Sequence, residues 1–212
     1  MAAPVVDPEL RARRKEEIRD QLLAKVEEML EQGESYSLLG IDRLASEAGI
    51  GRSTFYKYFA DKSELLGAWY ELIARSTESA ANEWLEGIDG SSTRADLRDA
   101  LEDIFRAYMP HVRLLSVINE AAFYDQTLGE AIRHRVEPGS GRLQKHIERG
   151  QREGWIDPDL DPGGTARWLR WMSDRGRHQL LLAVDEAERN RLLDALTEIV
   201  WATLYEFAPS RG

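Results

Sequence analysis

Residues 40–65 read GIDRLASEAGIGRSTFYKYFADKSEL, and this stretch decides the fold of the N-terminal part of the chain. Apolar positions at helical spacing predict a short helix over 41–48 and a second one over 52–59. The break between them, GIG at 49–51, holds two glycines, which tight turns prefer. Asp61 then predicts the cap of a longer helix. Two short helices joined by a glycine-containing turn are typical of a helix-turn-helix.

The second short helix has an outward face that carries no carboxylate. At about 100° per residue, Phe55 and Phe59 lie about 40° apart and mark the buried side. The same spacing places Ser53 and Lys57 on the opposite side, with a Thr and a Tyr beside them. Such hydroxyl and ammonium groups can contact phosphates and base edges of duplex DNA. We therefore expect this face to bind DNA through Ser53, Thr54, Tyr56 and Lys57.

Cations on neighbouring segments support the same prediction. Residues 43–60 hold three cations and one acid, and residues 11–15 hold four cations and no acid. Arg43, early in the preceding helix, is expected to reach the DNA backbone. Lys62 lies in the first turn of the next helix, where free N–H groups also favour a phosphate.

The stretch from Gly40 to Leu65 resembles the DNA-binding signature of the TetR family of repressors. Two departures are visible: Gly40 stands where the family usually has a capping Thr, and Tyr58 stands where many members have His. The resemblance implies that the phenol of Tyr58 serves a phosphate, and that Phe55 and Phe59 belong to the core. With the neighbouring arginines, the predicted DNA-binding set is Arg43, Arg52, Ser53, Thr54, Tyr56, Lys57, Tyr58 and Lys62.

The rest of the chain also reads as helical, so the predicted fold class is all-α. No alternating β-branched run of useful length occurs. We expect a three-helix DNA-binding domain over residues 1–62 and a ligand-binding and dimerisation domain of about six helices over 63–212. Pro138-Gly139-Ser140-Gly141 is predicted to interrupt the helical run. Beyond the helix starting at Asp61, the predicted helices are 94–109, 112–123, 128–136, 143–152, 165–184 and 186–207. Thr93 is the predicted cap of the first of these.

A single helix-turn-helix reads few base pairs, so two copies spaced by one turn of DNA, about 34–36 Å, are the usual solution. The family resemblance implies that the last two helices pair two chains. These helices present a broad apolar arc, although the arc could instead complete the core of one chain. The predicted homodimer interface consists of Leu169, Met172, Leu180, Leu181, Leu192, Leu193, Leu196, Ile199, Val200 and Leu204.

Aromatic and sulfur-containing side chains recur on the central helices, where they could line an apolar pocket or fill an ordinary core. Segment 154–162 resembles the loop that commonly precedes the first of the family's last two helices. Segments 168–175 and 199–205 resemble the ethionamide-response repressor branch of the family, which implies an apolar effector pocket. We expect a small, mostly apolar effector whose binding spoils the spacing of the two DNA-reading helices. The predicted ligand-binding residues are Trp69, Trp84, Phe105, Tyr108, Met109, Asn119, Phe123, Tyr124, Trp168 and Trp171.

Composition limits the other possibilities. The net charge of −10 gives DNA binding no bulk support, and residues 1–65 carry ten Lys and Arg against thirteen Asp and Glu. The chain has no cysteine, its four histidines lie on different predicted elements, and no catalytic fingerprint occurs. We therefore expect no enzyme activity, no metal and no cofactor.

The longest apolar run, 180–184, is far shorter than the roughly 20 residues that span a bilayer. The first residues lack the apolar region of a secretion signal, so we expect a cytoplasmic protein without a membrane partner. The alternative function is an all-helical adaptor that does not bind DNA.

Overall fold

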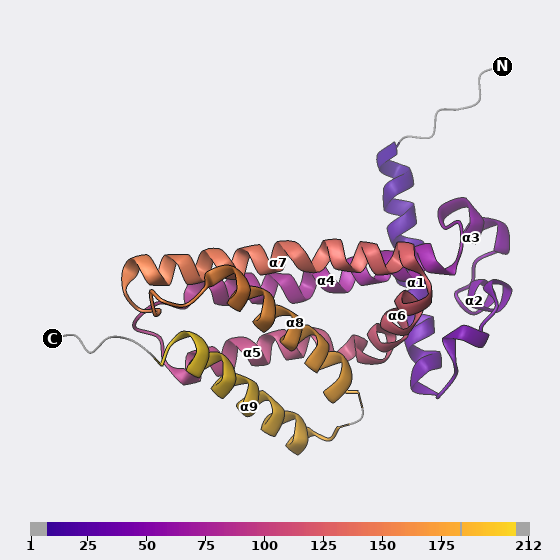
Figure 1. The fold of residues 1–212 in the computed structure, drawn as a ribbon. Coiled ribbons are helices and arrows are strands. Elements are labelled where there is room, and N and C mark those ends of the chain that lie inside the picture. Colours follow the sequence, from indigo (N-terminus) through magenta and orange to yellow (C-terminus); the bar gives the residue numbers. More distant parts are fainter. Residues whose placement is uncertain (1–7, 183, 207–212) are drawn as a thin grey trace. The chain divides into compact units, whose positions relative to one another are not determined.

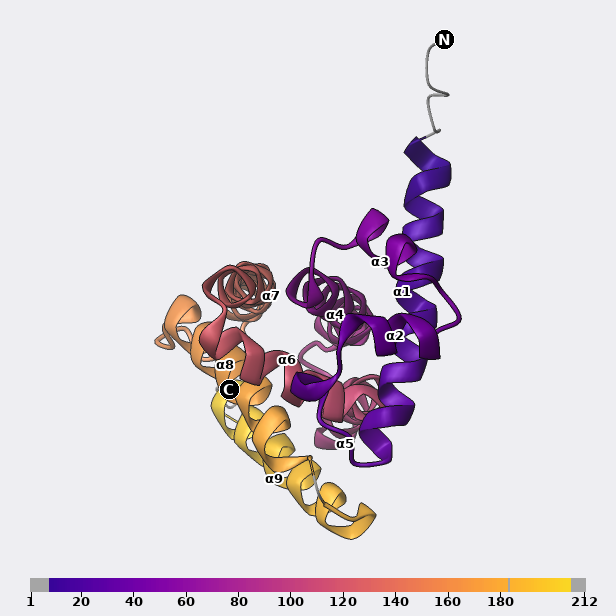
Figure 2. The ribbon, with the colours of Figure 1, turned by 90° about the vertical axis from the view of Figure 1, so that its right-hand side faces the viewer.

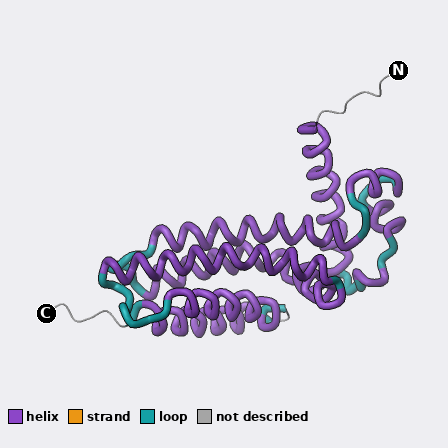
Figure 3. The backbone as a smooth tube through the Cα atoms, turned by 45° about the horizontal axis from the view of Figure 1, so that its top comes forward, coloured by secondary structure: helices purple, strands orange, loops and turns teal. Residues whose placement is uncertain are grey.

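The computed structural model describes residues 8–182 and 184–206, and helices are the regular elements of that part of the chain (Figures 1 and 3). The side chains of residues 135–138 are not among those described. The prediction of an all-α chain is confirmed. The elements, including two short 3-10 helices, are α1 (Pro8–Glu31), η1 (Tyr36–Leu38), α2 (Ile41–Glu47), α3 (Arg52–Tyr58), α4 (Lys62–Gly87), α5 (Arg94–Tyr108), η2 (Met109–His111), α6 (Val112–Tyr124), α7 (Gln126–Glu153), α8 (Pro162–Leu180) and α9 (Glu186–Leu204).

The chain divides into two compact units, each described here by itself. The first contains the residues up to Tyr70 and residues 113–129, and the second contains 71–112 and the residues from Glu130 onward. This grouping differs from the predicted boundary after residue 62, because the first unit also takes the beginning of α4 and most of α6. Three apolar side chains of α6 are buried, and nothing in the neighbouring sequence shows which of the two units they pack in: Leu114, Leu115 and Ile118.

In the first unit, the apolar stripe of α1 forms the centre of the core. Ile18 and Leu22 are fully buried there, and α2 and α3 lie beside α1 (Figure 2). Trp69 of α4 is also fully buried. Its indole Nε1 donates a hydrogen bond to the Arg19 carbonyl at 3.1 Å, and its ring meets Tyr36 edge-on at 6.0 Å. These contacts fix the beginning of α4 to the first helix.

Helix α2 ends at a glycine whose backbone is in the left-handed region, and this glycine begins the turn to α3. Gly49 has φ +68°. The Ile50 N–H donates to the Ala45 carbonyl at 2.9 Å, and the Gly49 N–H donates to Ser46 at 3.0 Å. This pair of bonds is the Schellman motif, which satisfies carbonyls left over at a helix end. The predicted glycine break therefore lies at the turn where the chain changes direction between α2 and α3.

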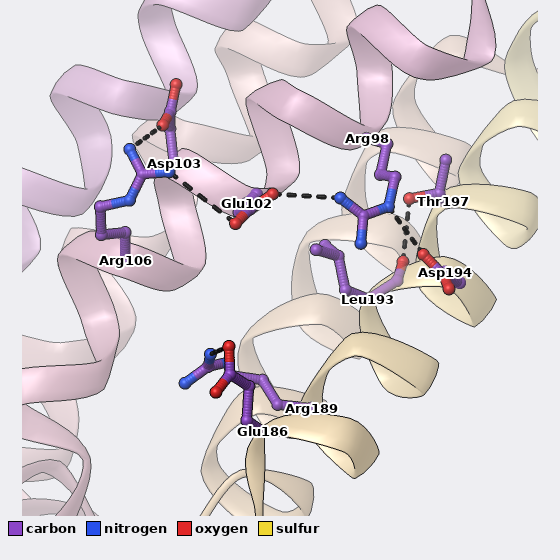
Figure 4. Close-up of polar contacts among 9 residues, drawn as sticks. All are labelled: Arg98, Glu102, Asp103, Arg106, Glu186, Arg189, Leu193, Asp194 and Thr197. Carbon is purple, nitrogen blue, oxygen red and sulfur yellow. Dashed lines mark hydrogen bonds and ion pairs between the residues drawn. The ribbon is translucent and has the colours of Figure 1, made fainter.

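In the second unit, α5 and α9 pack along each other, and ion pairs join their outer sides (Figure 4). Arg98 Nε of α5 donates to Asp194 of α9 at 2.7 Å, and its Nη1 donates to Glu102 at 3.0 Å. Thr93 caps α5 as predicted, because its hydroxyl accepts the Asp96 N–H while the Asp96 carboxylate accepts the Thr93 N–H. The capping box therefore fixes the start of α5, and the ion pairs along its side fix its packing against α9.

Several predicted helix boundaries in the second half of the chain need correction. The break at 138–141 is wrong, because α7 continues as one helix from Gln126 to Glu153. Burial of Ile132, Leu143 and Ile147 on either side offsets the roughly 3 kcal/mol that a proline costs a helix interior, at about 1.5–3 kcal/mol per side chain.

The last two helices also differ from their predicted ranges. α8 begins at Pro162 rather than at residue 165, because Asp161 caps it by accepting the Gly164 N–H at 2.9 Å. It ends at Leu180 rather than 184. α9 ends at Leu204, and residue 207 of the predicted helix lies outside the described residues. Within the described chain, no helix combines the length and the apolar character that crossing a bilayer requires.

Candidate nucleic-acid interface

The face of α3 is presented by the burial of its two phenylalanines. Phe55 and Phe59 are almost completely buried, and their rings lie 5.7 Å apart. Gly51 stands at the N-cap of α3, and the Phe55 N–H donates to its carbonyl at 3.1 Å. This packing directs the other side of α3 to solvent, as the helical spacing predicts.

The exposed side of α3 carries donors and no acid. Ser53, Tyr56 and Lys57 are exposed, while Thr54 and Tyr58 are partly buried. The Lys57 ammonium lies 5.5 Å from the centre of the Tyr58 ring, which keeps this cation on the helix surface. None of the seven residues of α3 is Asp or Glu. The structure therefore brings six of the eight predicted DNA-binding residues together on one helix, with Arg52 at its first position.

The two arginines of the predicted set lie next to carboxylates. Arg43 pairs with Glu34 at 2.8 Å. Arg52 of α3 donates to both oxygens of Asp42, at 2.8 and 3.0 Å. All four side chains are at least partly exposed, and exposed ion pairs contribute only about 0–1 kcal/mol. A DNA phosphate can therefore compete for either arginine at small cost.

Lys62 has a structural position that the sequence did not indicate. Its ammonium donates to the carbonyls of Tyr36 and Leu39 at 2.7 and 2.8 Å, and it lies 4.3 Å from the centre of the Tyr36 ring. Burial lowers the pKa of this lysine below its usual value. In this arrangement Lys62 holds η1 and the start of α4 together instead of facing outward to a phosphate.

The start of α4 is also fixed by a carboxylate network. Asp61 accepts the Glu64 N–H at 2.8 Å, which confirms the predicted cap. The Glu64 carboxylate accepts the Ala60 N–H at 2.8 Å and pairs with Lys15 at 2.7 Å. The bond from Ala60, followed by the bond from Lys15, lowers the pKa of Glu64. These bonds hold the segment between α3 and α4, and therefore the orientation of α3 within this unit.

The second unit contains a small, partly open cavity of about 60 Å³. Side chains from α4, α5, α7, α8 and α9 line it. Of the ten residues predicted to bind a ligand, only Trp84 belongs to this lining. Sequence reasoning missed the charged lining residues, because single charges on amphipathic helices look like solvent-facing positions: Glu78, Arg142, Arg170 and Arg177.

A second cavity of about 150 Å³ lies among α5, α8 and α9, and its lining is mostly apolar. Phe105 is the one predicted ligand-binding residue on its wall, which also includes Met172 and Leu181. Tyr108 lies nearby in the core of this unit and shares a hydrogen bond with Nδ1 of His178.

The other predicted ligand-binding residues are not part of either cavity wall. Trp69 belongs to the core of the first unit, as described above. Asn119 donates to the Leu115 carbonyl of its own helix at 2.8 Å. Phe123 and Tyr124 are 82% and 88% exposed, respectively. Met109 lies in η2 and is partly buried, and Trp168 and Trp171 lie on the exposed side of α8.

The predicted dimer interface separates into two groups. Five of its residues are buried inside the single chain, so they complete the core of this unit and offer no surface to a partner: Leu169, Leu181, Leu193, Val200 and Leu204. The others are exposed or partly exposed: Met172, Leu180, Leu192, Leu196 and Ile199. Trp168 and Trp171, which were predicted to bind ligand, join Met172, Leu180 and Ile199 in lining an apolar groove on α8 and α9.

The fold and the α3 surface together define a helix-turn-helix protein of the DNA-binding class. Residues 27–69 match the family described as bacterial regulatory proteins, tetR family. This match places a TetR-type DNA-binding segment in the chain and, with the similarity to EthR, supports a TetR-family transcriptional regulator, which favours DNA binding over the helical adaptor.

Two curated relatives cover most of the chain. The HTH-type transcriptional regulator EthR of Mycolicibacterium smegmatis is 27% identical over 161 residues, which are 73% of this chain and 70% of that protein. The nucleoid occlusion factor SlmA of Aliivibrio fischeri is 26% identical over 146 residues, which are 68% of this chain and 74% of that protein.

Solved structures share the fold. A TetR transcription regulator from Haloarcula marismortui matches with a TM-score of 0.72 and 23% identity, covering 91% of this chain and 99% of that one. NalD, the secondary repressor of the MexAB-OprM multidrug efflux pump in Pseudomonas aeruginosa, matches with a TM-score of 0.66 and 19% identity, covering 91% and 99%.

Proposed function

We propose that the protein is a repressor that binds an inverted-repeat operator as a homodimer and leaves it when a small organic effector binds the second unit. The carboxylate-free face of α3 is the observation that carries the DNA-binding part of this proposal. In a chain of net charge −10, a helix surface bearing hydroxyls, a phenol and Lys57 but no acid is suited to a polyphosphate partner.

The exposed apolar groove of α8 and α9 supports the dimer. Trp168 is 79% exposed, Leu180 53% and Ile199 48%. Large apolar side chains clustered on one surface are typical of a subunit interface, and two-fold pairing makes the same patch meet itself. A dimer also supplies the second recognition helix that an inverted repeat requires.

The cavity of the second unit supports regulation by an effector. Six residues of its wall belong to α4, among them Thr77, Glu78 and Asn82. The same helix begins at Lys62, four residues after the end of α3. An effector that displaces the cavity end of α4 would therefore act on the helix that follows the DNA-reading helix. We propose two dimer states, of which only one matches the spacing of successive major grooves.

Selection of bound sequences from a random duplex pool tests the proposal. We expect an inverted repeat whose half-site centres are about one helical turn, 10–10.5 base pairs, apart. A pool that yields no repeated half-site would contradict operator recognition, and transcription that falls when the protein is removed would contradict repression.

Fluorescence anisotropy with the selected duplex then tests the α3 surface. Lys57→Ala should weaken binding, change the base preference and reduce the salt slope by about one. Lys145→Ala, which removes an exposed lysine of α7, is the matched control and should bind like the parent. Equal affinity of the two variants would show that α3 does not contact the operator through Lys57.

A further inference from the structure

The small cavity of the second unit is lined by more positive than negative charge. Arg142, Arg170 and Arg177 line it together with one carboxylate, Glu78. A second carboxylate, Asp174, lies 3.5 Å from Arg177. Among the described side chains, three guanidinium groups therefore face two carboxylates, which leaves one unit of positive charge around a cavity only partly open to water.

The ion pairs at the cavity show which arginine carries the excess positive charge. Arg142 pairs with Glu78 at 3.1 Å, and Arg177 pairs with Asp174. Burial alone would raise the pKa of Asp174, but the hydrogen bond from His178 and the charges of Arg177 and Arg170 outweigh burial and lower it to about 2. Asp174 is thus ionised and already engaged, whereas Arg170 forms no ion pair within 4.0 Å among the described residues.

The same arginine has an unused donor. Arg170 Nε is buried and has no hydrogen-bond partner in the described part of the chain, and the side-chain oxygen of Asn82 is in the same condition. Both residues belong to the cavity wall. A buried polar group without a partner costs about 1–3 kcal/mol. Because an amide can turn by 180° and present its NH₂ instead, both residues can donate to an acceptor placed in the cavity.

The size of the cavity and the rest of its wall limit the ligand. A volume of about 60 Å³ holds about four to six water-sized groups. Apolar side chains complete the wall, including Leu101, Ile104 and Val200. A ligand that satisfies this wall has an anionic head with strong acceptors and a short apolar body. The charged part of this wall does not suit the mostly apolar effector expected from the sequence.

We propose that this cavity binds a small organic monocarboxylate, with its carboxylate on Arg170 and Asn82 and its short carbon chain against the apolar wall. The proposal names the effector class of the repressor proposed above and rests on that function. A carboxylate accepts two parallel bonds from a guanidinium, which gives this pairing both strength and direction.

Calorimetric titration of the protein alone, without DNA, tests the site directly. The probes are sodium propionate and sodium butyrate, compared at equal ionic strength with 1-butanol, butylammonium chloride and sodium phosphate. We expect binding of the two carboxylates and much weaker binding of the other three. Stronger binding of the alcohol, the amine or phosphate than of the carboxylates would overturn the proposal.

A pair of variants of α8 separates the site from general charge effects. Arg170→Met should weaken butyrate binding at least tenfold, whereas Arg167→Met, which removes an exposed arginine of the same helix, should leave it unchanged. Arg170→Lys, which keeps the charge but loses the planar fork, should be intermediate and serves if the methionine variant does not fold. Equal binding by parent, Arg170→Met and Arg170→Lys would refute the assignment to Arg170.

Release of operator DNA by butyrate is measured separately. Because the calorimetric titration contains no DNA, its outcome judges the carboxylate site, while the release measurement judges the regulatory function on which the inference rests. Butyrate binding without release would support the site and contradict effector release.

Discussion

At the scale of single residues, we expect Lys62 to contribute to the stability of the fold and Lys57 to contribute to DNA binding. The Lys62 ammonium donates to two backbone carbonyls within its own unit, whereas the Lys57 side chain is exposed on α3. We expect Lys62→Met to lower the free energy of unfolding by about 1–3 kcal/mol, because two partly buried carbonyls lose a charged donor. Urea denaturation measures this change. Lys57→Met is the control and should unfold like the parent.

The resemblance to the TetR signature assigned Lys62 to DNA contact, and the two roles predict different results. If Lys62→Met unfolds at the same urea concentration as the parent and loses affinity for all duplexes equally, the lysine acts on phosphates rather than on the first unit. A loss of stability with unchanged DNA affinity of the folded fraction would support the structural role.

His146 gives the second unit a dependence on acid. Its Nδ1 bonds to the Leu85 carbonyl at 3.0 Å, and Tyr205 donates to its Nε2 at 2.7 Å, so the ring is neutral. Burial, with the nearby charge of Arg149, lowers its pKa to about 4. The unfolded chain therefore binds a proton at this residue near pH 6.5, at which the folded chain does not.

The sign of the pH effect follows from this difference. As the pH falls from about 6.5 to about 4, the unfolded state gains protons first, and the free energy of unfolding should drop by up to about 3 kcal/mol. Urea denaturation at pH 7.5, 6 and 5 measures the drop. His146→Gln should have a flatter acid limb than the parent, whereas His134→Gln, at an exposed position of α7, should keep the parental slope. Parallel slopes for all three proteins would exclude His146 as the source.

At the scale of elements, the turn between α2 and α3 depends on one backbone conformation. Gly49 has φ +68°, and a Cβ atom placed there would meet nothing within 4 Å. Gly49→Ala should therefore cost only the backbone strain, about 1–2 kcal/mol. For a chain of this size, that corresponds to a fall in melting temperature of about 2–8 °C.

Gly40→Ala is the matched control, because its N-cap φ is −75° and the space around it is also open. It should melt within about a degree of the parent. If both variants melted at the same temperature, the positive φ of Gly49 would not be the cause of the lower melting temperature.

Elements with local signals could be predicted, and those that depend on distant packing could not. The glycine turn, the Asp61 cap and the Thr93 capping box each involve neighbouring residues only. The continuity of α7 depends on burial of apolar side chains on both sides of residues 135–138, and a proline inside the helix hid this continuity from the sequence analysis. The aromatic residues were the hardest case, because Trp69 and Trp84 occur in similar helical patterns but lie in the core of one unit and on the cavity wall of the other.

At the scale of the whole molecule, DNA affinity should depend on the apolar groove of α8 and α9. Ile199 and Trp168 line that groove and are 48% and 79% exposed in the single chain. If a second copy covers them, Ile199→Asp places a charge in a buried apolar contact and should give a monomer, which analytical ultracentrifugation detects. Phe123→Asp is the control, because Phe123 is exposed on α6 and should leave the dimer intact.

The monomer should lose affinity selectively. When two recognition helices are linked, the second binding event takes place at the high effective concentration that linkage provides, which strengthens binding by about 10²–10⁴-fold. Ile199→Asp should therefore bind the full inverted repeat at least about 100-fold more weakly than the parent, yet bind a duplex with one half-site as the parent does. Anisotropy with both duplexes measures this. A variant that is monomeric and still prefers the full repeat would show that the two half-sites are occupied without pairing through α8 and α9.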